Sequence, residues 1–221
     1  MKSRNILWGA SALFFLAACT KQADYREIIT ASAVASKANI ASATTRATGT
    51  TTSTAPVVAA GYTLYTILAG QHYCDKSTFK FLTLSTQKFS VRFDSSGVYK
   101  TIDPVNQYDI NKLYGFSEGL NHEYNSARIG WAYNNGALRL YAYAYKNGLR
   151  QSKEITTVPL NQEIACSIKV SGYSYIFTAK GVSVTLPRAK NTATASGYQL
   201  YPYFGGDEVA PKTIFIQIKP L

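Results

Sequence analysis

Residues 125–150 read NSARIGWAYNNGALRLYAYAYKNGLR and contain two Asn-Gly pairs, Asn135-Gly136 and Asn147-Gly148. An Asn-Gly pair between alternating residues indicates a two-residue β-hairpin, because a type I′ turn needs positive φ at both central positions. The stretch therefore predicts three consecutive antiparallel strands joined by two tight turns.

The positions of the two turns determine which residues face each other across these strands. The first turn places Trp131 opposite Leu140 on an apolar side of the sheet. The opposite side contains arginines and tyrosines, with Arg128 opposite Tyr143 and Tyr145 opposite Arg150. We call it the Arg-Tyr face; its members are Arg128, Arg139, Tyr141, Tyr143, Tyr145 and Arg150. Because arginine is seldom buried without a partner, this face is expected to point away from the core.

Two interpretations of the Arg-Tyr face stay open. Tyrosine has a high β-propensity, so the face could be an ordinary exposed side of a sheet. Alternatively, flat tyrosine rings stack on sugar rings and arginines bind hydroxyls or carboxylates, which makes its six members candidate ligand-binding residues.

The rest of the C-terminal part also has the pattern of β-strands. Apolar residues alternate with polar ones in short runs separated by Gly, Asn and Ser, which is typical of an antiparallel sandwich or barrel. The runs lie at residues 62–68, 88–93, 163–170, 173–178, 182–186 and 213–219. Residues 104–124 show no clean period and are expected to form a long loop.

The N-terminus has the pattern of a secretory signal. A short basic region precedes an apolar run at residues 6–18, too short for a membrane-spanning helix of roughly 20 apolar residues. Residues Leu16-Ala17-Ala18-Cys19 resemble the processing signal of bacterial lipoproteins, which implies cleavage after residue 18 and acylation of Cys19, palmitate included. Thr20, where an aspartate would mark inner-membrane retention, favours the outer membrane.

Composition predicts two further regions. Residues 19–60 are rich in Ala, Ser and Thr and have few large apolar residues, so we expect a flexible tether after the lipidated cysteine. Residues 61–221 are expected to form one antiparallel β domain, a monomer held to the membrane by its lipid alone.

Charge and cysteine content limit the partners and cofactors. The chain has a formal net charge of +11, but its Lys and Arg are spread out, so an anionic ligand is favoured and nucleic acid is not. Cys74 and Cys166 could form a disulfide or remain two buried thiols. No metal site is expected, because only His72 lies near either cysteine, and no cofactor motif occurs.

Two segments resemble a known fold family. Residues 200–218, LYPYFGGDEVAPKTIFIQI, are similar to the closing strands of concanavalin A-like jelly-roll domains, which include lectins, glucanases and polysaccharide lyases. Residues 125–148 resemble a central hairpin of such domains in bacterial surface lipoproteins. The resemblance implies an all-β, two-sheet antiparallel jelly roll with adjacent terminal strands and a ligand groove on the concave sheet.

Three functional hypotheses follow. We expect a non-catalytic envelope protein that binds a polysaccharide, neutral or anionic, through the Arg-Tyr face. The resemblance to lyases implies the alternative of β-elimination on uronate polymers, with His122, Arg128 and Tyr143 as catalytic residues. A structural or adhesive protein is the third hypothesis. A retaining glycosidase is disfavoured because no two carboxylates share a strand face. The position of His122 relative to the Arg-Tyr face would separate the first two hypotheses.

Overall fold

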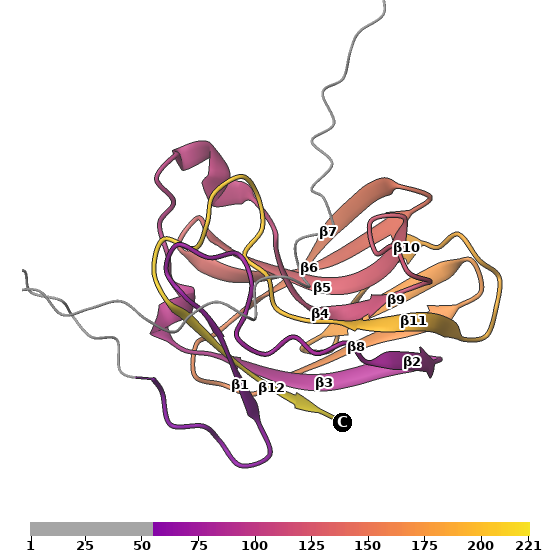
Figure 1. Ribbon diagram of the computed structural model, residues 1–221, viewed down its shortest axis with the longest axis horizontal. Helices are drawn as coiled ribbons and strands as arrows, with labels where there is room; N and C mark the ends of the chain where they lie inside the picture. The colour runs from indigo at the N-terminus through magenta and orange to yellow at the C-terminus, as the bar shows by residue number, and fades with distance from the viewer. Residues whose placement is uncertain (1–54) are drawn as a thin grey trace, which may run out of the picture. The chain divides into compact units, whose positions relative to one another are not determined.

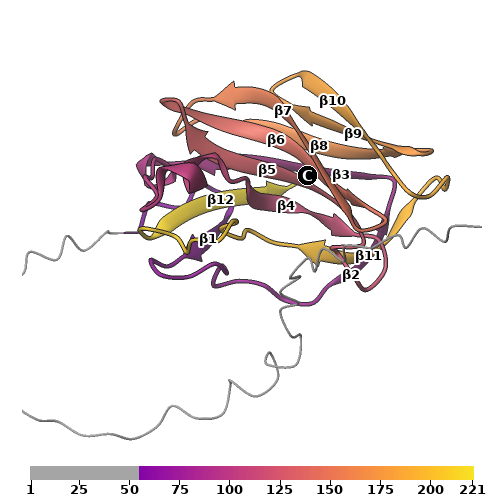
Figure 2. The same ribbon diagram turned by 90° about the horizontal axis from the view of Figure 1, so that it is seen from above.

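The computed structural model describes residues 55–221, which form an antiparallel two-sheet jelly-roll sandwich (Figures 1 and 2). The predicted signal peptide, the predicted lipidation site at Cys19 and the predicted tether up to residue 54 lie outside the described residues. No helix in the described part is long and apolar enough to cross a membrane.

Each sheet contains six strands. Sheet 1 has the order β1 (Thr63–Ile67), β12 (Ile214–Pro220), β3 (Thr86–Phe93), β8 (Ile164–Ser171), β9 (Ser174–Ala179) and β10 (Val182–Pro187). Sheet 2 has the order β2 (Phe81–Leu84), β11 (Ala195–Leu200), β4 (Asn111–Ser117), β5 (Asn125–Asn134), β6 (Ala137–Lys146) and β7 (Leu149–Val158). Two short 3-10 helices, η2 (Ser95–Gly97) and η3 (Pro104–Tyr108), lie between β3 and β4. The first and last strands are neighbours, as the resemblance implies.

The register predicted from the Asn-Gly turns is confirmed. Strands β5 and β6 place Arg128 opposite Tyr143 and Trp131 opposite Leu140. Strands β6 and β7 place Tyr145 opposite Arg150. At both turns the asparagine and the glycine have positive φ, with values of 49° and 71° at the first and 50° and 80° at the second, as a type I′ turn requires.

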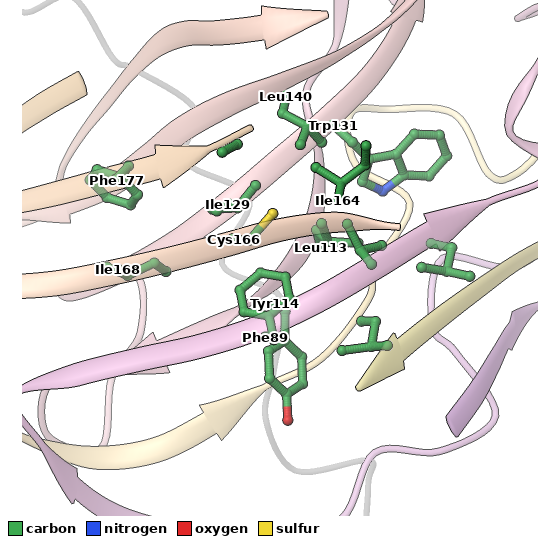
Figure 3. Packing of buried hydrophobic residues seen from close by; sticks show 14 of the residues in the cluster. Phe89, Leu113, Tyr114, Ile129, Trp131, Leu140, Ile164, Cys166, Ile168 and Phe177 are labelled. Atoms are coloured by element: carbon green, nitrogen blue, oxygen red, sulfur yellow. The ribbon is translucent and has the colours of Figure 1, made fainter. Parts of the chain in front are cut away.

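The core lies between the two sheets. The apolar side of β5 and β6 contributes Ile129, Trp131 and Leu140, which are fully buried. They pack with residues of sheet 1, and Figure 3 shows this cluster. The sheet-1 residues labelled there are Phe89, Ile164, Cys166, Ile168 and Phe177. Residues at every second position of the predicted runs fill this core, so the alternation identified the inward side correctly.

The expected loop over residues 104–124 is wrong at its centre, because residues 111–117 form strand β4. Almost every residue of β4 is buried, on the outer side of the sheet as well as the inner side. The pairing with β5 also shifts between Lys112 and Tyr114. A strand that is covered on both sides and contains an irregularity shows no alternation of apolar and polar residues, so the sequence pattern does not predict it.

The possible disulfide between Cys74 and Cys166 is not formed; both are free, buried thiols. Cys74 bridges to β1 at the edge of sheet 1, whereas Cys166 lies in β8, with β12 and β3 between the two strands. Strands are spaced about 4.8 Å apart, so the two cysteines are too far apart for a disulfide. Burial raises the pKa of Cys74 to about 11 and that of Cys166 to about 12.

A buried ion pair connects the end of β4 in sheet 2 with the end of β10 in sheet 1. The guanidinium of Arg188 donates from Nε and Nη2 to the two carboxylate oxygens of Glu118, and both side chains are almost completely buried. The Tyr175 hydroxyl of β9 donates to Glu118 at 2.6 Å. The remaining N–H groups of Arg188 donate to Gly172 O and to oxygens of Thr192 and Thr194. This guanidinium therefore has a partner at each nitrogen.

We expect Arg188→Ala to lower the free energy of unfolding by about 3–5 kcal/mol, because it removes the buried partner of the Glu118 carboxylate and leaves only the half-exposed Lys190, 3.9 Å away, as a counter-charge. Arg139→Ala is the matched control: Arg139 pairs with the partly exposed Glu154, and a surface pair contributes about 1 kcal/mol or less. Chemical denaturation measures both values. The double variant Glu118→Gln with Arg188→Met should recover part of the loss. Equal effects of the two single variants would contradict the structural role of the buried pair.

Candidate functional site

The Arg-Tyr face lies on the side of sheet 2 that points away from sheet 1. Its centre is nevertheless buried, with Arg128 6% and Tyr143 2% exposed. The residues before β4 cover one part of it, since a Cβ atom on Gly130 would lie 2.4 Å from Ile110 Cγ2. Tyr141 lies opposite Gly130 in that covered part. The part of the Arg-Tyr face around Arg128 is therefore the candidate functional site.

Arg128 is the central residue of this site. Its Nε has no hydrogen-bond partner within residues 55–221, and it forms none of the ion pairs found there. Burial lowers the pKa of its guanidinium, and the nearby Tyr143, Tyr198 and Glu123 oppose this shift. Arg128 and Arg188 are both buried, but of these two only Arg188 is paired with a carboxylate within the described residues.

Gly115 allows the strand of Arg128 to approach β4. The two residues are partners in the β4–β5 pairing. A Cβ atom at position 115 would lie 2.1 Å from Ala127 O and 2.6 Å from Arg128 Cα. Only glycine fits such a close approach of two backbones.

Lys112 of β4 adds a second cation, which is partly buried. Its Nζ lies 5.3 Å from the centre of the Tyr143 ring and 5.6 Å from that of Tyr203, within the range of cation–π attraction. Two backbone hydrogen bonds of 2.9 Å hold Tyr203 beside Lys112. Burial, and then the positive charges of Arg128 and Arg150, lower the pKa of Lys112 to about 8. Several positive charges therefore lie close together at this site, and their mutual repulsion costs electrostatic energy.

His122 lies at the same site. Its Nδ1 is 2.8 Å from the hydroxyl oxygen of Tyr198 in β11. Burial, and then the positive charges of Arg128 and Lys112, lower its pKa to about 4, so the imidazole is neutral at neutral pH. When Nδ1 donates its proton to the Tyr198 oxygen, Nε2 can accept a proton and the tyrosine hydroxyl can donate one.

The structure gathers some of the predicted site residues and separates others. His122, Arg128, Tyr143, Tyr145 and Arg150 lie near one another, with the rings of Tyr143 and Tyr145 5.9 Å apart. Arg139 instead pairs with Glu154 at 2.8 Å, and the Tyr141 hydroxyl lies 3.4 Å from Asn134 Nδ2. A ligand-binding role for each residue stays a prediction.

Three residues of the site were missed by the sequence analysis: Lys112, Tyr198 and Tyr203. Lys112 lies in β4, which the sequence predicts as part of a loop, and the two tyrosines come from the chain after β10. Tyr203 also stacks on His72, with ring centres 5.3 Å apart. Pairing of β4 with β11 brings these segments together, and no short-range turn signal reports such a pairing.

Other parts of the molecule offer less chemistry. Within residues 55–221, no group of three or more His, Cys, Asp or Glu side chains could hold a metal ion. Two surface hollows, of about 410 and 380 Å³, lie away from Arg128 and have no histidine in their walls.

Comparisons with known proteins give structural similarity only. No family model matches the chain, and no curated protein matches it. Among solved structures, alginate lyase AlyC3 has 13% identity and a TM-score of 0.48 over 72% of this chain and 74% of that one. A family 7 alginate lyase, A1-II′, in complex with product has 10% identity and a TM-score of 0.45 over 73% and 80%. Carbohydrate-binding module CBM66 from Bacillus subtilis has 8% identity and a TM-score of 0.35 over 72% and 92%. These identities and TM-scores are too low to carry a function from those proteins over to this chain.

We expect the imidazole of His122 to titrate near pH 4 in proton NMR spectra, with assignment from a His122→Asn variant. Arg128→Met should raise the midpoint, because it removes a positive charge beside the ring. The midpoint should stay below the usual value of about 6.5, because burial is the largest cause of the shift. A midpoint that does not move in Arg128→Met would show that the two side chains are not electrostatically coupled.

Proposed function

We propose that the outward face of sheet 2 around Arg128 binds a carboxylate-bearing polysaccharide. The observation that carries this proposal is a buried guanidinium whose Nε has no partner in the described chain. Burying a charge is costly unless an opposite charge compensates it. A ligand carboxylate would supply that charge, and the planar guanidinium suits its geometry.

Aromatic residues around the cations favour a sugar over a simple anion. Tyr143, Tyr145, Tyr198 and Tyr203 lie close enough to Arg128 or Lys112 to affect pKa values or to contact the lysine directly. Tyrosine combines a flat apolar ring with a hydroxyl, so it can stack on the C–H face of a sugar and hydrogen-bond its rim. A uronate unit has both the carboxylate and the ring that this combination would recognise.

The proposed location agrees with such a ligand. The lipoprotein-like signal at residues 16–19 supports anchoring of a monomer in the outer membrane through acylated Cys19, with the domain carried on a tether. Polysaccharides of the envelope or of the surroundings are accessible to a protein placed there.

A second candidate function, cleavage of the bound polymer by β-elimination, is favoured by the His122–Tyr198 pair. Arg128 and Lys112 would neutralise the uronate carboxylate and so acidify the C5 proton. Neutral His122 would take that proton at Nε2 as the C4–C5 double bond forms. The C4–O bond would break as the Tyr198 hydroxyl protonates the departing oxygen. Tyr198 thereby replaces Tyr143 as the acid, because Tyr198 is the tyrosine hydrogen-bonded to the imidazole.

Binding is tested by calorimetry with polygalacturonate and alginate as probes. We expect Arg128→Met to weaken binding about tenfold to a hundredfold, since a hydrogen bond to a charged group contributes about 1.5–3 kcal/mol. Lys112→Met should also weaken it. Arg92→Met is the control, because Arg92 lies on β3 of sheet 1 and contacts Asn161 O. Undiminished affinity of Arg128→Met would rule out the proposed site.

Cleavage is tested separately, by the ultraviolet absorbance of the unsaturated product. We expect His122→Ala and Tyr198→Phe to lower kcat by about 10²–10⁴-fold with little change in affinity. The acid limb of kcat/KM should fall near pH 4, because His122 must be neutral to accept a proton and protonates below that value. A wild-type protein that binds the polymers and yields no unsaturated product is a binding protein only.

A further inference from the structure

Two phenylalanines stand on the edge of sheet 2 beside the site. Phe79 is 67% and Phe81 60% exposed, so two large apolar rings lie next to each other at the surface. The ring of Phe79 lies 5.5 Å from that of Tyr198, tilted by 30°, and 6.2 Å from that of Phe81. Phe81 of β2 is also the partner of Tyr198 in β11, so both side chains point to the same side of the sheet. We call Phe79, Phe81 and Tyr198 the edge aromatic cluster.

The edge aromatic cluster is continuous with the charged site. Tyr198 belongs to the cluster and its hydroxyl also contacts His122. Arg128 lies on β5, and the order β2, β11, β4, β5 separates it from Phe81 by three strand spacings, or roughly 14 Å. One sugar ring cannot cover that distance, whereas an oligosaccharide lying across the strands can.

We propose that the edge aromatic cluster is a stacking subsite for a further sugar ring of the same polysaccharide whose carboxylate binds at Arg128. The proposal rests on the proposed function and extends it, since it makes an oligosaccharide, and not a single uronate, the recognised unit. The side chains of Thr83 and Ser196, hydrogen-bonded to each other on the same side of the sheet, place hydroxyl groups next to the apolar rings. A sugar ring has an apolar C–H face and a rim of hydroxyl groups, and apolar side-chain rings bordered by hydroxyls are complementary to both. β2 has only four residues, which makes its free edge a poor template for pairing with a second copy of the chain.

The test compares affinities for uronate oligosaccharides of increasing length, from the disaccharide to the hexasaccharide, prepared from polygalacturonate and alginate. We expect Phe79→Ala with Phe81→Ala to weaken binding of the hexasaccharide about fivefold to tenfold, because aromatic stacking is lost. Binding of the disaccharide should not change, since it reaches only the Arg128 site. Arg128→Met should weaken binding at every length.

Tyr173→Ala is the matched control, because Tyr173 is 62% exposed but lies between β8 and β9 of sheet 1. Thermal melting checks that every variant is folded. The subsite is overturned if the double phenylalanine variant loses affinity equally for all oligosaccharide lengths, or for none of them. It is also overturned if the variant and the wild type differ in oligomeric mass in analytical ultracentrifugation, because the cluster would then serve self-association. If the wild type binds no oligosaccharide of any length, the proposed function itself fails.

Discussion

The buried pair of Glu118 and Arg188 joins the two sheets, and the geometry of the outward site depends on it. Glu118 directly follows β4, and the segment with His122 begins immediately after it. Arg188 follows β10, and its bonds to Thr192 and Thr194 shape the connection that leads into β11. One ion pair therefore fixes the start of both segments that supply the His122–Tyr198 hydrogen bond. The chemistry on the outside of sheet 2 relies on a contact buried at its end.

The two buried arginines show how the same side chain can serve structure or recognition. Arg188 has a carboxylate and carbonyl or hydroxyl oxygens around it, so its burial stabilises the folded chain only as part of a complete network. Arg128 is buried beside Lys112, where the like charges oppose each other. Such an arrangement lowers the stability of the free protein, and strongly perturbed groups of this kind concentrate at functional sites. The two arginines differ in the groups that surround them, and neither the amino-acid composition nor the exposed fraction of the side chain reveals that difference.

Local signals predicted the middle of the molecule and failed where partners come from distant segments. The Asn135-Gly136 and Asn147-Gly148 turns gave the register of three strands, because side-chain alternation and turn geometry are local properties. Strand β4 was missed because both of its sides are covered. Its pairing with β11, and with it the roles of Lys112 and Tyr198, depends on contacts far apart in sequence. Burial of Arg128 was not foreseen either, since the segments that cover the Arg-Tyr face are brought there by the tertiary fold.

Gly115 has a consequence for how such a site can diversify. Any side chain at this position would collide with the backbone of β5 beside Arg128, so natural variation is barred there regardless of the ligand. Exposed positions at the two ends of the outward face of sheet 2, such as Phe79 and Arg150, are not restricted in this way. During evolution the centre of the face should therefore change little, whereas substitutions at its ends can adapt the scaffold to different polymers without refolding it.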